Sequence, residues 1–166
     1  TAVFLFGALA FAPAARAGIT VQAQANTAWV SGTANSLTTL SFTPGTGGVL
    51  VAMVAGEGAS PGITSITWNG TPLTKAASAV GGAFAHIYYL AAPAAGSGTL
   101  SVTLASAVNR SVVGALYATG VGNVESFAVN SSTGSGDLTA GPITATSGAL
   151  VVNTAGHSAG AFSSGG

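Results

Sequence analysis

The chain has 166 residues, and charged residues make up 4% of it, against roughly 25% in an average soluble domain. Three acidic and three basic residues cancel to a net charge of zero, so the chain has no basic surface for nucleic-acid phosphates. It contains no cysteine, which excludes disulfides and thiolate metal sites. Hydrophobic residues account for 48% of the chain, which indicates a buried core rather than a disordered segment.

The first 17 residues are predicted to be a secretory signal peptide. An apolar run from Ala2 to Ala12 is followed by Ala15 and Ala17, which fit the A-x-A cleavage pattern. The run is too short for a transmembrane helix, and no Met or basic segment precedes it, so we interpret the leader as clipped at its N-terminus. The alternative is a buried strand or helix of the mature fold. We expect cleavage after Ala17, secretion to the extracellular space or cell surface, no membrane span thereafter, and one domain over residues 18–166.

From Gly18 onward the sequence pattern is typical of β-strands. Short apolar or alternating runs recur between clusters of Gly, Pro, Ser and Asn, without the i, i+3, i+4 spacing of amphipathic helices. The expected strands span residues 19–24, 37–42, 48–55, 63–68, 72–75, 84–90, 99–105, 111–119, 124–129, 143–146 and 149–153. We therefore predict an all-β fold, an antiparallel two-sheet sandwich with jelly-roll-like topology.

Two strands have a pattern that predicts their surroundings. Residues 49–55 are apolar without alternation, which predicts a strand buried on both faces. In residues 99–105, Leu100, Val102 and Leu104 alternate with Thr and Ser, so one face is expected in the core and the other in water. A loop over residues 94–98 is expected to join this strand to residues 84–93 as a hairpin.

The clearest local signal is the turn at Asn69-Gly70. Both residue types tolerate positive φ, as a type I′ hairpin turn between Trp68 and Thr71 requires. Pro72 follows on the return strand, and proline cannot donate to a strand ladder. This strand is therefore expected at a sheet edge.

Five segments carry a resemblance to a protein family: "GGVLVAMVAGEG", "ITSITWNGTPLTKA", "HIYYLAAPAAGSGTLSVTLASA", "SVVGALYATGV" and "SGALVVNTAG". In this order they resemble a family of bacterial secreted β-sandwich modules of large cell-surface and repeat-containing proteins, over residues 20–156. The resemblance implies a jelly-roll-like sandwich without an established catalytic role. Such modules continue beyond the "ALVV" strand into at least one more apolar strand. The sandwich is therefore expected to lack its last strand if the chain is truncated at its C-terminus, which would leave a sheet edge for another chain.

One motif points to an enzyme. Residues 156–160, "GHSAG", match the G-x-S-x-G nucleophile elbow, with Ser158 as the nucleophile. The following "AFSSGG" is poor helix material, and Asp137 and His86 precede the serine, whereas in α/β-hydrolases the acid and the histidine follow it. A serine hydrolase is therefore the least favoured hypothesis, and we predict no catalytic residue.

Other chemistry has few residues to draw on. The acids Glu57, Glu125 and Asp137 are scattered, so no pair stands out for glycosidase chemistry. His86 and His157 are far apart in the sequence, and no cysteine supports them as metal ligands. We therefore predict no metal site and no cofactor.

Two aromatic residues suggest a binding function. Trp68 and Tyr88 could stack on sugar rings if both lie exposed on one face, whereas Tyr89 falls on the opposite face by alternation. A carbohydrate-binding module is thus the alternative hypothesis. Our primary prediction is a secreted, non-catalytic structural or adhesive module of a cell-surface assembly, with other protein subunits or neighbouring modules as partners through its sheet edges.

Overall fold

The computed structural model describes residues 4–13, 18–27, 30–31, 36–57, 62–132, 143–145 and 149–157, and every regular element in this part is a β-strand. The strands are β1 (Phe4–Pro13), β2 (Thr20–Asn26), β3 (Val30–Ser31), β4 (Ser36–Phe42), β5 (Val49–Glu57), β6 (Ile63–Trp68), β7 (Thr71–Pro72), β8 (Thr74–Val80), β9 (Ala83–Ala91), β10 (Gly98–Leu104), β11 (Arg110–Thr119), β12 (Val121–Ser132) and β13 (Leu150–His157).

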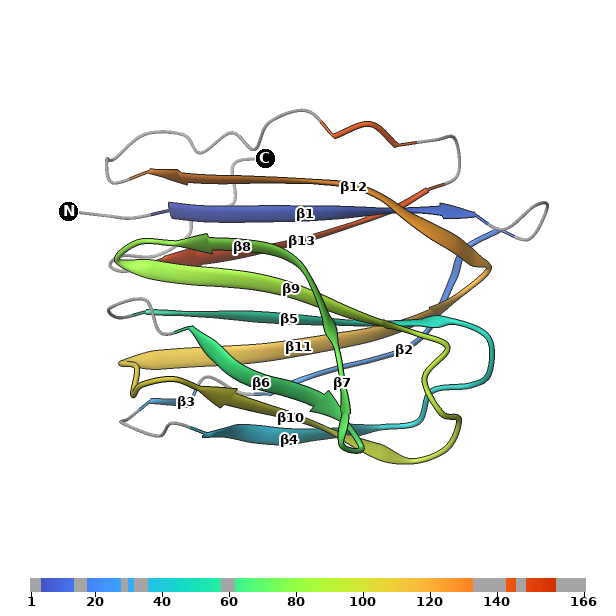
Figure 1. The fold of residues 1–166 in the computed structure, drawn as a ribbon, viewed down its shortest axis with the longest axis horizontal. Coiled ribbons are helices and arrows are strands. Elements are labelled where there is room, and N and C mark those ends of the chain that lie inside the picture. The colour runs from blue at the N-terminus through green and yellow to red at the C-terminus, as the bar shows by residue number, and fades with distance from the viewer. Residues whose placement is uncertain are drawn as a thin grey trace.

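The strands form antiparallel sheets (Figure 1). The central sheet has six strands in the order β2-β11-β5-β9-β8, with β3 also paired to β11. A four-stranded sheet, β4-β10-β6-β7, faces it, and a three-stranded sheet, β12-β1-β13, contacts β5, β8 and β9. The predicted all-β antiparallel sandwich is confirmed. Between β4 and β11 the chain crosses repeatedly from one facing sheet to the other.

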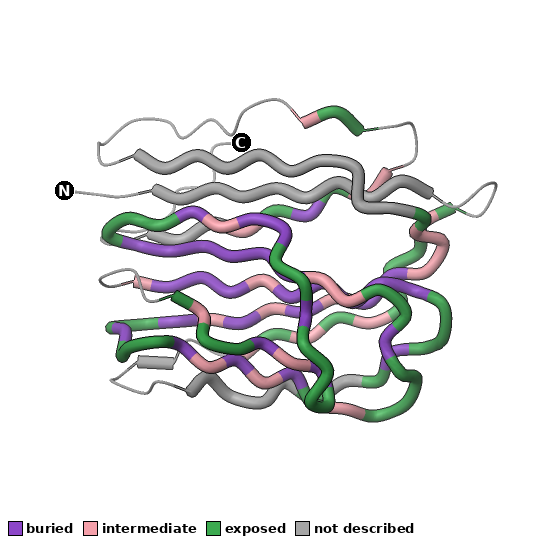
Figure 2. Tube along the Cα trace, viewed as in Figure 1, coloured by how far each residue is buried: buried purple, intermediate pink, exposed green. Residues whose placement is uncertain are grey.

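Strand β5 is buried on both faces, as its unbroken apolar sequence predicts. Leu50 and Val54 belong to the larger core between the central and four-stranded sheets. The alternate residues Val49 and Val51 belong to a second core that includes Val152 of β13. Figure 2 shows this concentration of buried residues along β5 and the neighbouring β9. The second core explains why the central sheet needs a layer on each side.

The outer sheet follows its alternating pattern. Leu100, Val102 and Leu104 of β10 are buried, whereas the intervening Thr and Ser residues are half-buried or exposed. The predicted one-sided burial of this strand is confirmed.

The hairpin turn has the expected backbone. Asn69 has φ of 47° and Gly70 has φ of 83°, and Trp68 pairs with Thr71 across the turn. β7 ends at Pro72 on the edge of the four-stranded sheet, so the missing proline N–H breaks no ladder.

Three expectations about strands are wrong. β9 pairs with β5 and β8, whereas β10 pairs with β4 and β6, so the two strands form no hairpin. β9 is apolar on both faces and suits the central sheet, whereas β10 is apolar on one face and suits an outer sheet. The strand expected at residues 72–75 is split at Leu73 between β7 and β8, which lie in different sheets. Residues 143–145 form no strand, and residue 146 lies outside the described residues.

Most of the apolar run of the predicted leader lies in the three-stranded sheet. It forms β1, which lies between β12 and β13 and is antiparallel to both. Cleavage after Ala17 would therefore take β1 out of this sheet and separate β12 from β13.

Two glycines on paired strands test the tightness of the central sheet. A Cβ at Gly56 of β5 would collide with the Phe84 ring and the Arg110 carbonyl oxygen, whereas a Cβ at Gly114 of β11 would lie 3.5 Å from Met53 Cε, an ordinary contact. We predict that Gly56→Ala lowers the free energy of unfolding by about 1–3 kcal/mol through overpacking. The control Gly114→Ala should leave it unchanged or raise it by up to about 1 kcal/mol. Urea denaturation measures both, and equal stabilities of the two variants would contradict this packing.

Candidate functional site

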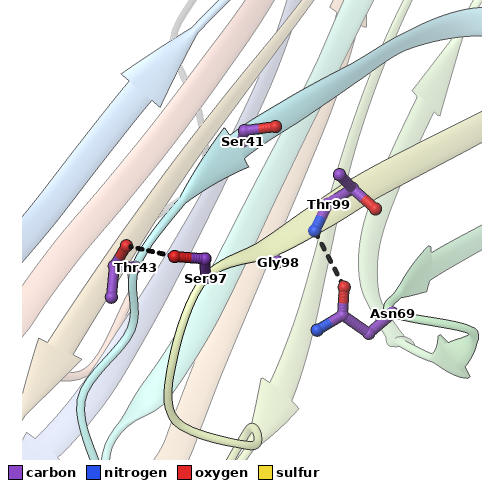
Figure 3. Close-up of a pocket in the computed structure, with 6 residues that line it drawn as sticks. All are labelled: Ser41, Thr43, Asn69, Ser97, Gly98 and Thr99. Carbon is purple, nitrogen blue, oxygen red and sulfur yellow. Dashed lines mark hydrogen bonds between the residues drawn. The ribbon is translucent and has the colours of Figure 1, made fainter.

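A polar pocket lies where the turn between β6 and β7 meets β4 and β10 (Figure 3). Its cavity volume is about 480 Å³, and its lining residues are Ser41, Thr43, Asn69, Ser97, Gly98 and Thr99. Gly98 is half-buried and the other five are exposed. Every lining side chain is a hydroxyl or an amide, apart from the glycine, and none of them carries a charge.

The left-handed turn fixes Asn69 at one wall of the pocket. The Asn69 backbone N–H donates to the Thr99 carbonyl at 3.0 Å, and the Thr99 N–H donates to Asn69 Oδ1 at 2.9 Å. The side chain is thus held by its oxygen, and its Nδ2 lies where it would meet a Cβ at Gly98. The turn chemistry that forms the hairpin therefore also orients an amide group toward the pocket.

The opposite wall is formed by the loop that follows β4 and the loop that precedes β10. The hydroxyl oxygens of Thr43 and Ser97 lie 3.4 Å apart, and either can donate to the other. Behind them the Gly96 N–H donates to the Pro44 carbonyl at 3.1 Å. These bonds hold two loops together that are far apart in the sequence.

Trp68 lies beneath the floor of the pocket. A Cβ at Gly98 would collide with the Trp68 ring and with Asn69, so only glycine fits between the indole and the pocket. Trp68 itself is 1% exposed. Its role is to support the floor from the core side.

The burial of Trp68 and Tyr88 corrects the expected sugar platform. Stacking on a sugar requires an exposed ring face, but Trp68 is 1% and Tyr88 is 9% exposed. Both side chains belong to the larger core, because Trp68 on β6 and Tyr88 on β9 point inward from the two facing sheets. Neither ring can therefore act as a binding platform.

His86 is a structural residue of the central sheet. It is 3% exposed, its Nδ1 is 2.8 Å from the Ser78 hydroxyl oxygen, and its ring centroid lies 5.6 Å from that of Phe84.

The residues of the hydrolase hypothesis are not brought together in the part of the chain that the structure describes. β13 ends at His157, and Ser158 and Asp137 lie outside the described residues. Within the described ranges, no three His, Asp or Glu residues are grouped so that they could hold a metal ion. The same ranges contain no helix long and apolar enough to cross a membrane.

A second candidate surface is the edge strand β2. Among the described strands β2 pairs only with β11, and the register is continuous from Ala23 to Asn26. Its residues are exposed or half-buried along the whole strand, and none is charged. An uncharged, exposed edge strand is a template for pairing with another chain.

Comparison with protein-family models, with curated proteins and with solved structures found no match to this chain.

The buried phenol of Tyr88 generates a prediction about pH. Burial raises the pKa of Tyr88 above its ordinary value of 10.0, because the folded protein disfavours the charged phenolate. The stability that this contributes is fully present below about pH 10 and is lost as the pH rises toward the folded-state pKa. We predict that the free energy of unfolding falls more steeply between about pH 9 and about pH 11 in the wild type than in Tyr88→Phe. Urea denaturation across this range tests it, and parallel curves for the two proteins would contradict it.

Proposed function

We propose that the protein is a secreted, non-catalytic structural module that joins neighbouring subunits of an extracellular or cell-surface assembly by strand addition at β2. The observation that carries the proposal is the exposed, uncharged edge of β2. The partner is a second copy of this chain, whose β2 adds antiparallel to the first.

The pairing of β2 with β11 shows which backbone groups of β2 point away from the central sheet. The Thr27 N–H donates to the Val113 carbonyl at 2.8 Å. Bonded and non-bonded pairs alternate along an antiparallel ladder, so Ala25 also faces β11. The N–H and C=O groups of Gln24 and Asn26 therefore point away from the central sheet. They are the groups that an added strand would use.

The opposite edge of the central sheet carries a charge, which β2 lacks. β8 carries the exposed Lys75, and its register with β9 is irregular between Lys75 and Ala77. A charge and a bulge are devices that prevent pairing at an edge. β2 has no charge. Its register with β11 shifts once, between Val21 and Ala23, and is regular from Ala23 to Asn26. The contrast favours β2 as the edge where subunits join.

The charge balance supports a second copy as the partner. A net charge of zero means that two copies are not held apart by long-range repulsion. Antiparallel pairing of the same strand on two subunits is self-complementary, because a two-fold axis relates the two edges. Main-chain hydrogen bonds then supply the affinity, as in other cases of strand addition.

The pocket and the buried histidine support a non-catalytic role. The lining side chains of the pocket have no acid or base that titrates near neutral pH. His86, the residue type suited to proton transfer, is buried and engaged with Ser78. The polar lining of the pocket is thus suited to binding.

We predict that the full chain self-associates and that Gln24→Pro abolishes the association. Proline removes the outward N–H of residue 24 and leaves the bonds of β2 to β11 intact, because an edge strand tolerates proline on its solvent side. Sedimentation velocity over a range of protein concentrations should show dimers of the wild type and monomers of Gln24→Pro.

The matched control is Gln24→Thr, which keeps the N–H and should associate as the wild type does. Circular dichroism and thermal melting check that both variants are folded. A wild type that stays monomeric at the highest concentration, or a folded Gln24→Pro that still dimerises, would refute the proposal.

A further inference from the structure

We infer that the pocket between β4, β10 and the turn at Asn69 binds a neutral carbohydrate. This goes beyond the proposed assembly function, since it concerns another surface and another class of ligand. The inference rests on three features: the donors and acceptors of the lining, their fixed positions, and the glycine floor above Trp68.

The lining matches the chemistry of sugar hydroxyl groups. The hydroxyls of Ser41, Thr43, Ser97 and Thr99 can each donate and accept, and the Asn69 amide offers further donors. A sugar hydroxyl also donates and accepts, so each side can satisfy the other. An anionic ligand would find no cationic side chain in this lining, and a metal cation would find no carboxylate. The pocket therefore selects for a neutral, polyhydroxyl ligand.

Three of the lining side chains, those of Asn69, Thr43 and Ser97, have hydrogen-bond partners before a ligand arrives. Asn69 Oδ1 accepts from the Thr99 backbone N–H, and the hydroxyl oxygens of Thr43 and Ser97 lie 3.4 Å apart. Ser41 and Thr99 are register partners across β4 and β10. Groups that are already ordered lose less conformational entropy on binding. The arrangement favours recognition without rearrangement of the loops.

Gly98 allows the Trp68 ring to pack directly beneath the floor of the pocket. A side chain at this position would collide with Trp68 and Asn69, so the floor consists of backbone alone above the indole ring. The cavity volume of about 480 Å³ falls in the range of about 300–1,000 Å³ typical of small-molecule sites. The pocket thus has a floor of backbone at Gly98 and polar walls.

The test uses immobilised neutral oligosaccharides beside sialylated and sulfated ones, probed with the full-length protein. We expect the wild type to bind neutral members and to ignore the anionic ones. Solution calorimetry with the best-bound oligosaccharide then gives the affinity. In an amide NMR titration with that oligosaccharide, the signals of Asn69, Ser97 and Thr99 should shift.

Two variants and one control locate the binding. Asn69→Gly keeps the left-handed turn but removes the amide, and Thr99→Val keeps the β-branched shape but removes the hydroxyl. Each should weaken binding by about 3- to 10-fold, the effect of one lost hydrogen bond. Thr103→Val makes the same change farther along β10, outside the pocket, and should bind as the wild type does.

Three outcomes would overturn the inference. They are the absence of binding to any neutral oligosaccharide, binding confined to anionic ones, and binding that Asn69→Gly and Thr99→Val leave unchanged. Thermal melting of each variant separates loss of binding from loss of fold. Because Gln24→Pro leaves the pocket intact, it should bind the same oligosaccharide, whatever the outcome of the assembly test.

Discussion

Strand β5 has apolar side chains on both faces, so water must be excluded from two sides of the same strand. Leu50 and Val54 are covered by the four-stranded sheet, whereas Val49 and Val51 are covered from the side of β13. Burying one apolar side chain of this size contributes about 1.5–3 kcal/mol, so leaving either face open would cost several such contributions. This requirement places β5 in the middle of the central sheet and makes β2 and β8 its edges.

The candidate surfaces follow from that arrangement. The core that covers one face of β5 includes Trp68, which lies directly below Gly98 and so supports the pocket floor. The same strand, β6, leads into the turn that holds Asn69. The packing of the core thus fixes the positions of the polar groups outside it. With β5 in the middle of the central sheet, β2 lies at one edge of that sheet and is therefore exposed.

Local patterns in the sequence predicted those features that depend on neighbouring residues. The double burial of β5, the one-sided burial of β10 and the positive φ angles at Asn69 and Gly70 were all predicted on this basis. Features that depend on the pairing of strands far apart in the sequence were not predicted. The placement of β9 and β10 in different sheets, and the inward orientation of Trp68 and Tyr88, depend on which strands face each other. The pocket depends on it too, because it unites residues near positions 43, 69 and 98. Asn69 in a left-handed turn was the one local signal that could have pointed to it.

Native-state hydrogen exchange of the full chain, followed by NMR, tests the central position of β5 most directly. Amides of β5 are bonded into β9 and β11 and lie between two cores, so they should exchange only through global unfolding. The outward amides of Gln24 and Asn26 on β2 should exchange fastest in a dilute, monomeric sample. The account predicts a wide separation between these two sets. Amides of β5 that exchange as fast as those of Gln24 and Asn26 would contradict it.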